Sequence, residues 1–160
     1  MTINVGDKIP AATLKTMGSD GPEEITTEDL FKGKTVALFA VPGAFTPTCS
    51  AKHLPGYVTN AEALKAKGVD PIACLSVNDA FVMGAWGKDQ NAGGKVQMLA
   101  DGNADLTRQL GLDLDASGHG MGVRSKRYSM IVEDGAIKVL NEEPPGAFEI
   151  SSAEAMLKQL

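Results

Sequence analysis

Two cysteines, Cys49 and Cys74, carry the most distinctive chemistry in this chain of 160 residues. Cys49 follows a segment that turns through two prolines and a glycine, and a helix is predicted to begin near it, after the run Val41-Pro42-Gly43-Ala44-Phe45-Thr46-Pro47-Thr48. The unpaired N–H groups and the positive dipole end of a helix stabilise an anion, so they favour the thiolate of such a cysteine. Because only the thiolate is a good nucleophile, the position indicates a reactive cysteine whose side chain the turn exposes. The alternative is a small buried apolar residue.

The residues around the two cysteines differ in kind. Thr46 lies three residues before Cys49, and its hydroxyl can hydrogen-bond a thiolate or cap the helix, two roles that are compatible. Cys74 lies inside the apolar run Ile72-Ala73-Cys74-Leu75. A cysteine in the middle of such a strand is expected to be buried and inert.

Histidines next to cysteines raise the question of a metal site. Cys49 and His53 are spaced by one helical turn, but no second pair of ligands completes a site, and His119 is isolated in a predicted loop. We therefore expect no metal. His53 itself is predicted to be a helix-surface or packing residue and not a catalytic base.

A basic cluster, Arg124-Ser125-Lys126-Arg127, precedes the last predicted hairpin. Such a cluster is usually a solvated face. Strand alternation through residues 127–131 would also allow one arginine to point inward. A guanidinium beside Cys49 would stabilise the thiolate and bind a polar oxygen substrate. The residues alone leave both interpretations open.

The elements that must position these residues alternate along the chain. Apolar runs predict strands at Thr35–Val41, Pro71–Val77 and Val96–Ala100. A helix is predicted from about Thr48 to Lys67, kinked at Pro55. Asn78-Asp79 is predicted to cap a second helix that ends near Gln90.

The second half of the chain predicts a short helix, a loop and a hairpin. The helix covers Asn103–Leu110, and Asp113–Ser125 has no clear period. Asp134-Gly135 joins two further strands, Tyr128–Val132 and Ala136–Leu140. Ser151 and Glu154 have the spacing of a capping box that opens the last helix. This order predicts one α/β domain over residues 1–160, with a central mixed sheet flanked by helices in a thioredoxin-like arrangement.

Composition excludes several classes of protein. The hydrophobic fraction of 43% and charged fraction of 22% are typical of a globular domain, and the net charge of −5 disfavours nucleic acid or an anionic membrane as a partner. No apolar run is long enough for a membrane span, and the first residues lack the pattern of a signal peptide. The cytoplasm is therefore the expected location, where both cysteines would remain thiols.

The segment from Pro42 to Cys49 resembles the active-site signature of the peroxiredoxins, in the form of the peroxiredoxin-five class that includes plant type II enzymes. The resemblance extends, in order and spacing, through three further segments, namely His53-Leu54-Pro55-Gly56-Tyr57, Ala73-Cys74-Leu75-Ser76-Val77-Asn78-Asp79-Ala80-Phe81 and Arg127-Tyr128-Ser129-Met130. It covers nearly the whole chain. The family is one of thiol peroxidases that reduce hydrogen peroxide and alkyl hydroperoxides.

The resemblance implies roles for four residues. Cys49 would be the peroxidatic cysteine, which attacks the O–O bond and becomes a sulfenic acid. Thr46 would hydrogen-bond the thiolate and the peroxide, and Pro42 would shield the sulfur from water. Arg127 matches the arginine that stabilises the thiolate and the developing charge on the peroxide oxygens. The mechanism implies no metal, flavin or haem.

Three other motif positions, Gly43, Phe45 and Thr48, are expected to contact the substrate on the same basis. The class also implies a homodimer.

The sequence departs from some members of the class in the second half-reaction. Those members carry a resolving cysteine near the C-terminus, whereas Glu149-Ile150-Ser151-Ser152 occupies that region here. An external thiol is therefore the expected reductant, with glutathione and glutaredoxin favoured and thioredoxin second. A thiol-based redox sensor or a chaperone-like protein is the alternative function.

Overall fold

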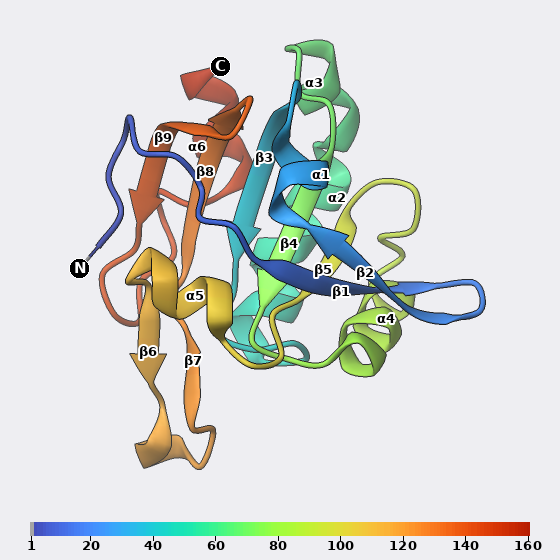
Figure 1. The fold of residues 1–160 in the computed structure, drawn as a ribbon, viewed down its shortest axis with the longest axis vertical. Helices are drawn as coiled ribbons and strands as arrows, with labels where there is room; N and C mark the ends of the chain where they lie inside the picture. The colour runs from blue at the N-terminus through green and yellow to red at the C-terminus, as the bar shows by residue number, and fades with distance from the viewer. Residues whose placement is uncertain (1) are drawn as a thin grey trace.

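The computed structural model describes residues 2–160, which form one large sheet with helices on both sides (Figure 1). The elements in chain order are β1 (Thr13–Gly18), β2 (Gly21–Thr26), α1 (Thr27–Phe31), β3 (Thr35–Ala40), the π-helix η1 (Cys49–His53), α2 (Leu54–Thr59), α3 (Ala61–Ala66), β4 (Ile72–Ser76), α4 (Ala80–Asp89), β5 (Gln97–Ala100), α5 (Asp105–Leu110), β6 (Asp113–Asp115), the 3₁₀ helix η2 (Ser117–His119), β7 (Val123–Ser125), β8 (Tyr128–Glu133), β9 (Ala136–Glu142) and α6 (Ala153–Gln159).

The main sheet is mixed. Its seven strands run in the order β2-β1-β5-β4-β3-β8-β9, with β3, β4 and β5 parallel and the flanking strands antiparallel. The expected α/β fold with a central mixed sheet is confirmed. The N-terminal β1–β2 hairpin and α1 were not predicted, because residues 13–31 lack a long apolar period.

Strand alternation divides the core into two layers. In β3, Ala37 and Phe39 face the layer beneath α2, α3, α4 and α6, whereas Val36 and Leu38 face the layer beneath α1 and α5. Because β3 is central and buried on both faces, its position is firmly fixed. The loop that leaves its end therefore starts from a rigid base.

The predicted helix from Thr48 to Lys67 is present in three pieces. Pro55 has no N–H to donate to the carbonyl four residues earlier, and the turn before it is widened into η1, in which the Leu54 N–H donates to Cys49 O. Asn60 then interrupts the run between α2 and α3. The kink expected at Pro55 is thus a π turn that contains Cys49 and His53.

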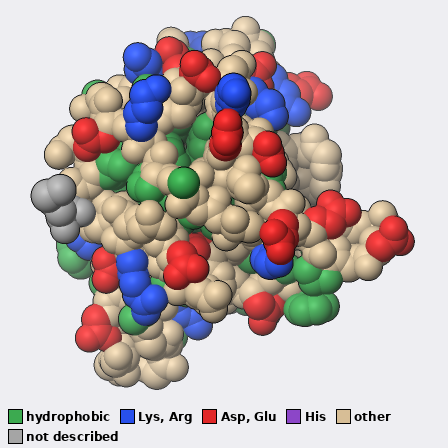
Figure 2. All heavy atoms as spheres, viewed as in Figure 1, with side chains coloured by type: hydrophobic (Ala, Val, Ile, Leu, Met, Phe, Trp, Pro, Cys, Tyr) green, Lys and Arg blue, Asp and Glu red, His purple; other side chains and the backbone are tan. Residues whose placement is uncertain are grey.

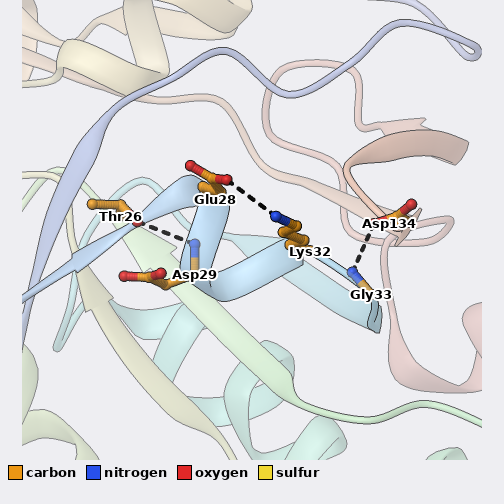
Figure 3. A network of polar contacts seen from close by, with 6 residues as sticks. All are labelled: Thr26, Glu28, Asp29, Lys32, Gly33 and Asp134. Carbon is orange, nitrogen blue, oxygen red and sulfur yellow. Dashed lines mark hydrogen bonds and ion pairs between the residues drawn. The ribbon is translucent and has the colours of Figure 1, made fainter.

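A network at the far end of β3 fixes this strand against the C-terminal hairpin (Figure 3). Asp134, in the β8–β9 turn, accepts a hydrogen bond from the Gly33 N–H at 2.7 Å and donates its own N–H to Lys34 O at 2.9 Å. The predicted Asp134-Gly135 turn is confirmed, with both residues at positive φ. The register between β3 and β8 is therefore held from this end.

Two predictions about local structure are corrected. Asp113–Ser125 is not an irregular loop, since it holds the small β6–β7 ribbon with η2 between the strands. The capping box at Ser151 is wrong, because α6 is capped by Ser152, whose hydroxyl accepts from the Ala155 N–H at 3.1 Å. Ser151 lies one residue too early and has another partner, the Glu143 carboxylate.

One face of the molecule is of mixed charge. On the face shown in Figure 2, acidic and basic side chains alternate with uncharged ones. Within residues 2–160, none of the helices has the length and apolar character needed to span a bilayer.

Candidate active site

Cys49 lies in the first turn of the helical segment. This segment follows the loop that leaves β3, residues 41–46, which we call the active-site loop. Its side chain has no exposed surface and belongs to the apolar layer that includes Phe39 and Tyr57. The expectation that the turn exposes this thiol is therefore wrong for this conformation. The helix start is present, but the sulfur points back into the molecule.

Arg127 supplies the charged group next to that sulfur. Its Nη2 donates a hydrogen bond to Cys49 Sγ at 3.1 Å, across 78 positions of sequence. Ala40 at the end of β3 pairs with Tyr128 at the start of β8, so this register places Arg127 beside the loop that follows β3. A charged donor on sulfur favours the thiolate over the thiol. Of the two options left open for the basic cluster, Arg127 takes the inward one.

His53 lies on the other side of the same guanidinium. Arg127 Nη1 is 2.8 Å from His53 Nδ1, and His53 Nε2 is 3.0 Å from Ser151 O. The imidazole is fully buried, so it is a packing residue and not a helix-surface one. Burial, with the nearby charge of Arg127, lowers the pKa of His53 to about 3 against the opposing effect of the Ser151 carbonyl. The ring is therefore neutral at physiological pH.

Thr46 is tied to the turn of the active-site loop. Its hydroxyl donates to Gly43 O at 2.7 Å, which uses the only proton of that hydroxyl. The sequence suggested that this hydroxyl donates to the Cys49 thiolate. It cannot do so while it donates to Gly43 O. Its oxygen lone pairs remain able to accept a hydrogen bond.

Gly43 is where this loop approaches its neighbours most closely. A Cβ there would lie 3.1 Å from Thr46 Cγ2, 3.3 Å from Met121 Cε and 3.4 Å from Arg124 Nη1. A methyl group at this position would be tight against these three side chains, which would have to shift by a few tenths of an ångström to admit it. The absence of a side chain at Gly43 therefore favours the close packing of the loop against Met121 and Arg124.

A second anchor comes from the loop after β4. Asn78 Oδ1 accepts the Ala44 N–H at 3.0 Å and lies 2.6 Å from Ser76 Oγ. Trp86 of α4 donates from Nε1 to Ser50 Oγ at 3.0 Å, and the exposed Phe45 ring lies 6.4 Å from the Trp86 ring. These contacts hold the loop on both sides of Cys49. Sequence analysis assigned Asn78 a role only with Asp79 as a helix cap, a role that Asp79 alone performs, and it did not identify Trp86, which does not adjoin the motif.

The C-terminal segment reaches the site through Glu143, which sequence analysis also missed. Its Oε2 accepts hydrogen bonds from the Glu149 N–H, the Ser151 N–H and the Ser151 hydroxyl at 2.7 to 2.8 Å. Its own N–H donates to Arg127 O at 3.0 Å. Glu143 therefore fixes both the backbone of Arg127 and the Ser151 carbonyl that His53 contacts. Burial is the largest single contribution and raises the pKa of Glu143, but the hydrogen bonds from Ser151, Glu149 and Ile150 together outweigh it and hold that pKa below its usual range.

A cleft of about 540 Å³ adjoins the site and is lined by Pro42, Thr48 and Arg127. This volume is in the range of small-molecule sites. Of the three positions expected to contact substrate, Thr48 lines the cleft, whereas Gly43 and Phe45 are not among its lining residues. A larger hollow of about 930 Å³ lies against β1 and α4. Cys49 lines neither space, but Pro42, Thr48 and Arg127 connect the smaller one to the site.

Cys74 lies in β4, between Phe39 of β3 and Met98 of β5. It is a free thiol with no exposed surface, like Cys49. Burial, and secondarily the nearby Cys49, raises the pKa of Cys74 well above its usual range, although Arg127 opposes the shift. Over the described part of the chain, no group of three or more metal-ligating side chains comes together.

Comparison with known proteins gives matches over nearly the full chain. Residues 4–157 match the family model described as Redoxin. The chain is 56% identical over 164 residues to peroxiredoxin-2E-2, chloroplastic, of Oryza sativa subsp. japonica, covering 99% of this chain and 73% of that protein. It is 48% identical to peroxiredoxin-2B of Arabidopsis thaliana, covering 99% and 98% respectively. Among solved structures, reduced Prx3 in complex with H₂O₂ from Vibrio vulnificus matches with a TM-score of 0.95 at 53% identity, covering 99% of each chain.

Proposed function

The chain belongs to the redoxin family as a peroxiredoxin, a thiol peroxidase, and we propose that Cys49 is its peroxide-reducing residue and that an external thiol restores it. The hydrogen bond from Arg127 Nη2 to Cys49 Sγ carries the first part of this proposal. The second part rests on two observations. Cys74 is buried, and Ser151 and Ser152 lie in the region where some members of the class carry a resolving cysteine.

The proposed first step is a displacement at oxygen. The Cys49 thiolate attacks one oxygen of a hydroperoxide, an S–O bond forms, and the O–O bond breaks with its electron pair on the leaving oxygen. Sulfur is oxidised to the sulfenic acid level, and the peroxide is reduced to water or an alcohol. The hydroperoxide proton ends on one of the two products, and solvent supplies the other proton. Arg127 stabilises the negative charge on sulfur before the step and on oxygen during it.

Thr46 and Pro42 complete the proposed site. Because the Thr46 hydroxyl donates to Gly43 O, its oxygen acts as an acceptor toward the O–H of the hydroperoxide. Accepting that hydrogen bond orients the peroxide for in-line attack by the sulfur. Pro42 lines the cleft beside the site and limits the access of water to it. From the motif, Gly43, Phe45 and Thr48 are expected to contact the substrate. Thr48 is best placed to do so, because it lines the cleft.

Resolution requires a second thiol. Glutathione would attack the Cys49 sulfenic acid to form a mixed disulfide and release water, and glutaredoxin would then reduce that disulfide by thiol–disulfide exchange. Cys74 is poorly suited to compete, because burial favours its neutral thiol over the attacking thiolate. Since Cys49 has no exposed surface, the turn that contains it must open for glutathione to reach the sulfur. Thioredoxin is the second candidate reductant.

Mass spectrometry tests the resolving step. One equivalent of peroxide followed by glutathione is expected to give a mixed disulfide on Cys49, and steady-state turnover is expected to be faster with glutaredoxin than with thioredoxin. A disulfide between Cys49 and Cys74 would contradict the external-thiol mechanism. Faster turnover with thioredoxin would replace glutaredoxin in the proposal.

We extend the proposal to assembly and location. Phe45 and Phe81 are exposed aromatic side chains, which are candidates for the contact surface of a homodimer. Sedimentation of the wild-type protein beside a Phe81→Ser variant tests this surface: a dimeric wild type with a monomeric variant is expected, and the same state in both proteins would contradict it. A cytoplasmic location is consistent with two unpaired thiols and is tested by fractionation of the source cells.

A further inference from the structure

One continuous path of hydrogen bonds joins the C-terminal segment to the reactive sulfur. Ser151 O contacts His53 Nε2 at 3.0 Å, and His53 Nδ1 contacts Arg127 Nη1 at 2.8 Å. Arg127 Nη2 then donates to Cys49 Sγ at 3.1 Å. The two terminal nitrogens of one guanidinium are thus divided between an imidazole and the sulfur.

The donors and acceptors on this path fix the state of the imidazole. A guanidinium only donates, so His53 Nδ1 must accept from Arg127. The other nitrogen, Nε2, therefore carries the proton and donates to Ser151 O. Both bonds require a neutral ring, which agrees with a His53 pKa lowered to about 3.

We propose that His53 is a positioning residue for catalysis, whose Nδ1 orients the Arg127 guanidinium toward the sulfur of Cys49. This inference rests on the proposed role of Arg127 in peroxide reduction. His53 does not contact the reacting atoms in it, and it acts only through the arginine. The Ser151 carbonyl fixes the tautomer and the orientation of the ring.

The surroundings of Arg127 explain why a dedicated acceptor is needed. The Phe148 ring lies 5.8 Å from the centre of the guanidinium and 5.0 Å from the His53 ring, and Phe39 lies 4.9 Å from the same imidazole. These rings restrict the arginine but offer no acceptor for its N–H groups. An arginine side chain has many rotamers, so a hydrogen bond at Nη1 selects the one that aims Nη2 at sulfur.

The far end of the path is also rigid. Glu143 accepts hydrogen bonds from the N–H and the hydroxyl of Ser151, so the Ser151 carbonyl faces His53 in a fixed direction. Tyr57 also donates to this carbonyl, at 2.9 Å, without contacting Arg127 in any described hydrogen bond. Tyr57 is thus a matched control that shares the anchor of His53 but not its contact with the arginine.

Two substitutions of His53 separate its two hydrogen bonds. In His53→Asn the amide lies near the position of Nδ1, so an acceptor for Arg127 remains and the bond to Ser151 is lost. In His53→Gln the amide reaches the position of Nε2, so the bond to Ser151 remains and the acceptor for Arg127 is lost. Both variants lose the packing of the ring against Phe39 and Phe148, so a purely structural role would affect them alike.

The measurement is the rate of peroxide consumption by each reduced protein as a function of pH, with thermal stability recorded in parallel. We expect His53→Gln to be slower than wild type by about tenfold or more near pH 7, with its rate profile moved to higher pH. His53→Asn is expected to recover most of that loss, and Tyr57→Phe to stay within about twofold of wild type. Equal rates for the two His53 variants, or an equal loss in Tyr57→Phe, would overturn the inference.

A measurement on the wild-type protein does not depend on how the variants fold. Nitrogen-15 spectra of the imidazole are expected to show the neutral ring with its proton on Nε2 between pH 5 and 8. A ring protonated on Nδ1, or a charged ring, would also overturn the inference. Failure of the proposed function itself is distinguishable, because wild-type protein would then consume no peroxide through Cys49.

Discussion

The two cysteines of this chain share their burial and differ in their hydrogen-bonding environment. Cys49 and Cys74 both have no exposed surface and lie in the same apolar layer. Cys49 begins a helical segment and accepts a hydrogen bond from the Arg127 guanidinium. Cys74 lies in the middle of a central strand, where burial raises its pKa. Burial alone therefore does not distinguish a reactive thiol from an inert one.

What distinguishes the two sulfurs is the presence of groups that stabilise a negative charge. Burial destabilises a thiolate unless charged or polarised donors compensate for the lost water. The Arg127 guanidinium is such a donor at Cys49, and it comes from a part of the chain 78 positions away. Each prediction below removes one part of this difference, in order of decreasing effect.

Removal of the reactive sulfur has the largest expected effect. Cys49→Ser is expected to lower the rate of peroxide consumption by at least about 10³-fold, because a serine hydroxyl is a poor nucleophile at neutral pH. The assay is stopped-flow loss of hydrogen peroxide in the presence of excess thiol. Retained turnover in this variant would contradict the assignment of Cys49.

Removal of the guanidinium tests why Cys49 differs from Cys74. Arg127→Lys keeps the charge but loses the divided pair of donors, and is expected to lower the rate by about 10²-fold. Arg124→Lys is the matched control in the same cluster. Arg124 donates to Met121 O and Val77 O and not to the sulfur, so we expect a loss of no more than about threefold. A wild-type rate in Arg127→Lys would mean that positive charge alone is sufficient, and equal losses in the two variants would mean that the specific contact of Arg127 to sulfur does not set the rate.

The Thr46 hydroxyl is the next component of the site. Thr46→Val removes the acceptor for the peroxide and the bond to Gly43 O, and is expected to lower the rate by about 10-fold to 10²-fold. Thr46→Ser keeps the hydroxyl and is expected to stay close to wild type when both are compared at the same peroxide concentrations. A slow Thr46→Ser variant would indicate that the methyl group, and not the hydroxyl, is what the site requires.

Acid tests the folded state around Cys49 through His53. The folded-state pKa of about 3 lies below the unfolded value of 6.5, so the unfolded chain binds the proton more readily. The free energy of unfolding is therefore expected to be unaffected by this group above pH 6.5 and to fall as the pH decreases toward 3. The loss is at most about 1.4 kcal/mol per pH unit in that window. Urea unfolding at several pH values measures it, and a His53→Asn variant with the same slope would assign the loss to other groups.

Substitution of Cys74 has the smallest expected effect on rate. Cys74→Ser is expected to leave the first oxidation of Cys49 within about twofold of wild type, since Cys74 contributes no described hydrogen bond to the site. Its cost is expected in stability, because a hydroxyl replaces an apolar thiol inside a central strand, at about 1–3 kcal/mol. A large loss of peroxidase rate in a stably folded Cys74→Ser variant would remove the contrast between the two cysteines.

Several elements could be predicted from the sequence because their signals are local. Apolar runs located β3, β4 and β5, and Asp134-Gly135 located the turn of the last hairpin. Local signals were misleading where two of them compete. Ser151 and Ser152 are both suitable helix caps, and the carboxylate of Glu143 binds the first of them, so that only the second caps α6.

The candidate site was also only partly accessible from sequence. Cys49 and Thr46 lie three residues apart, so one turn of chain relates them. His53 was noted as lying one helical turn from Cys49, but its partners, Arg127 and Ser151, are 74 and 98 positions away. No local pattern specifies contacts at such separations.

By itself, the sequence determined which residues are able to react: a cysteine at a helix start, a threonine before it, and a pattern of strands and helices that agrees with one α/β sheet. The residue patterns left open which basic residue reaches the sulfur, and the resemblance to peroxiredoxins indicated Arg127. The tertiary structure shows that contact and shows that His53 lies on the other side of the same guanidinium. The physical reason is that helix and strand patterns depend on neighbours a few residues apart. The direction of Arg127 depends instead on the register of β8 against β3, which is set by packing across the whole sheet.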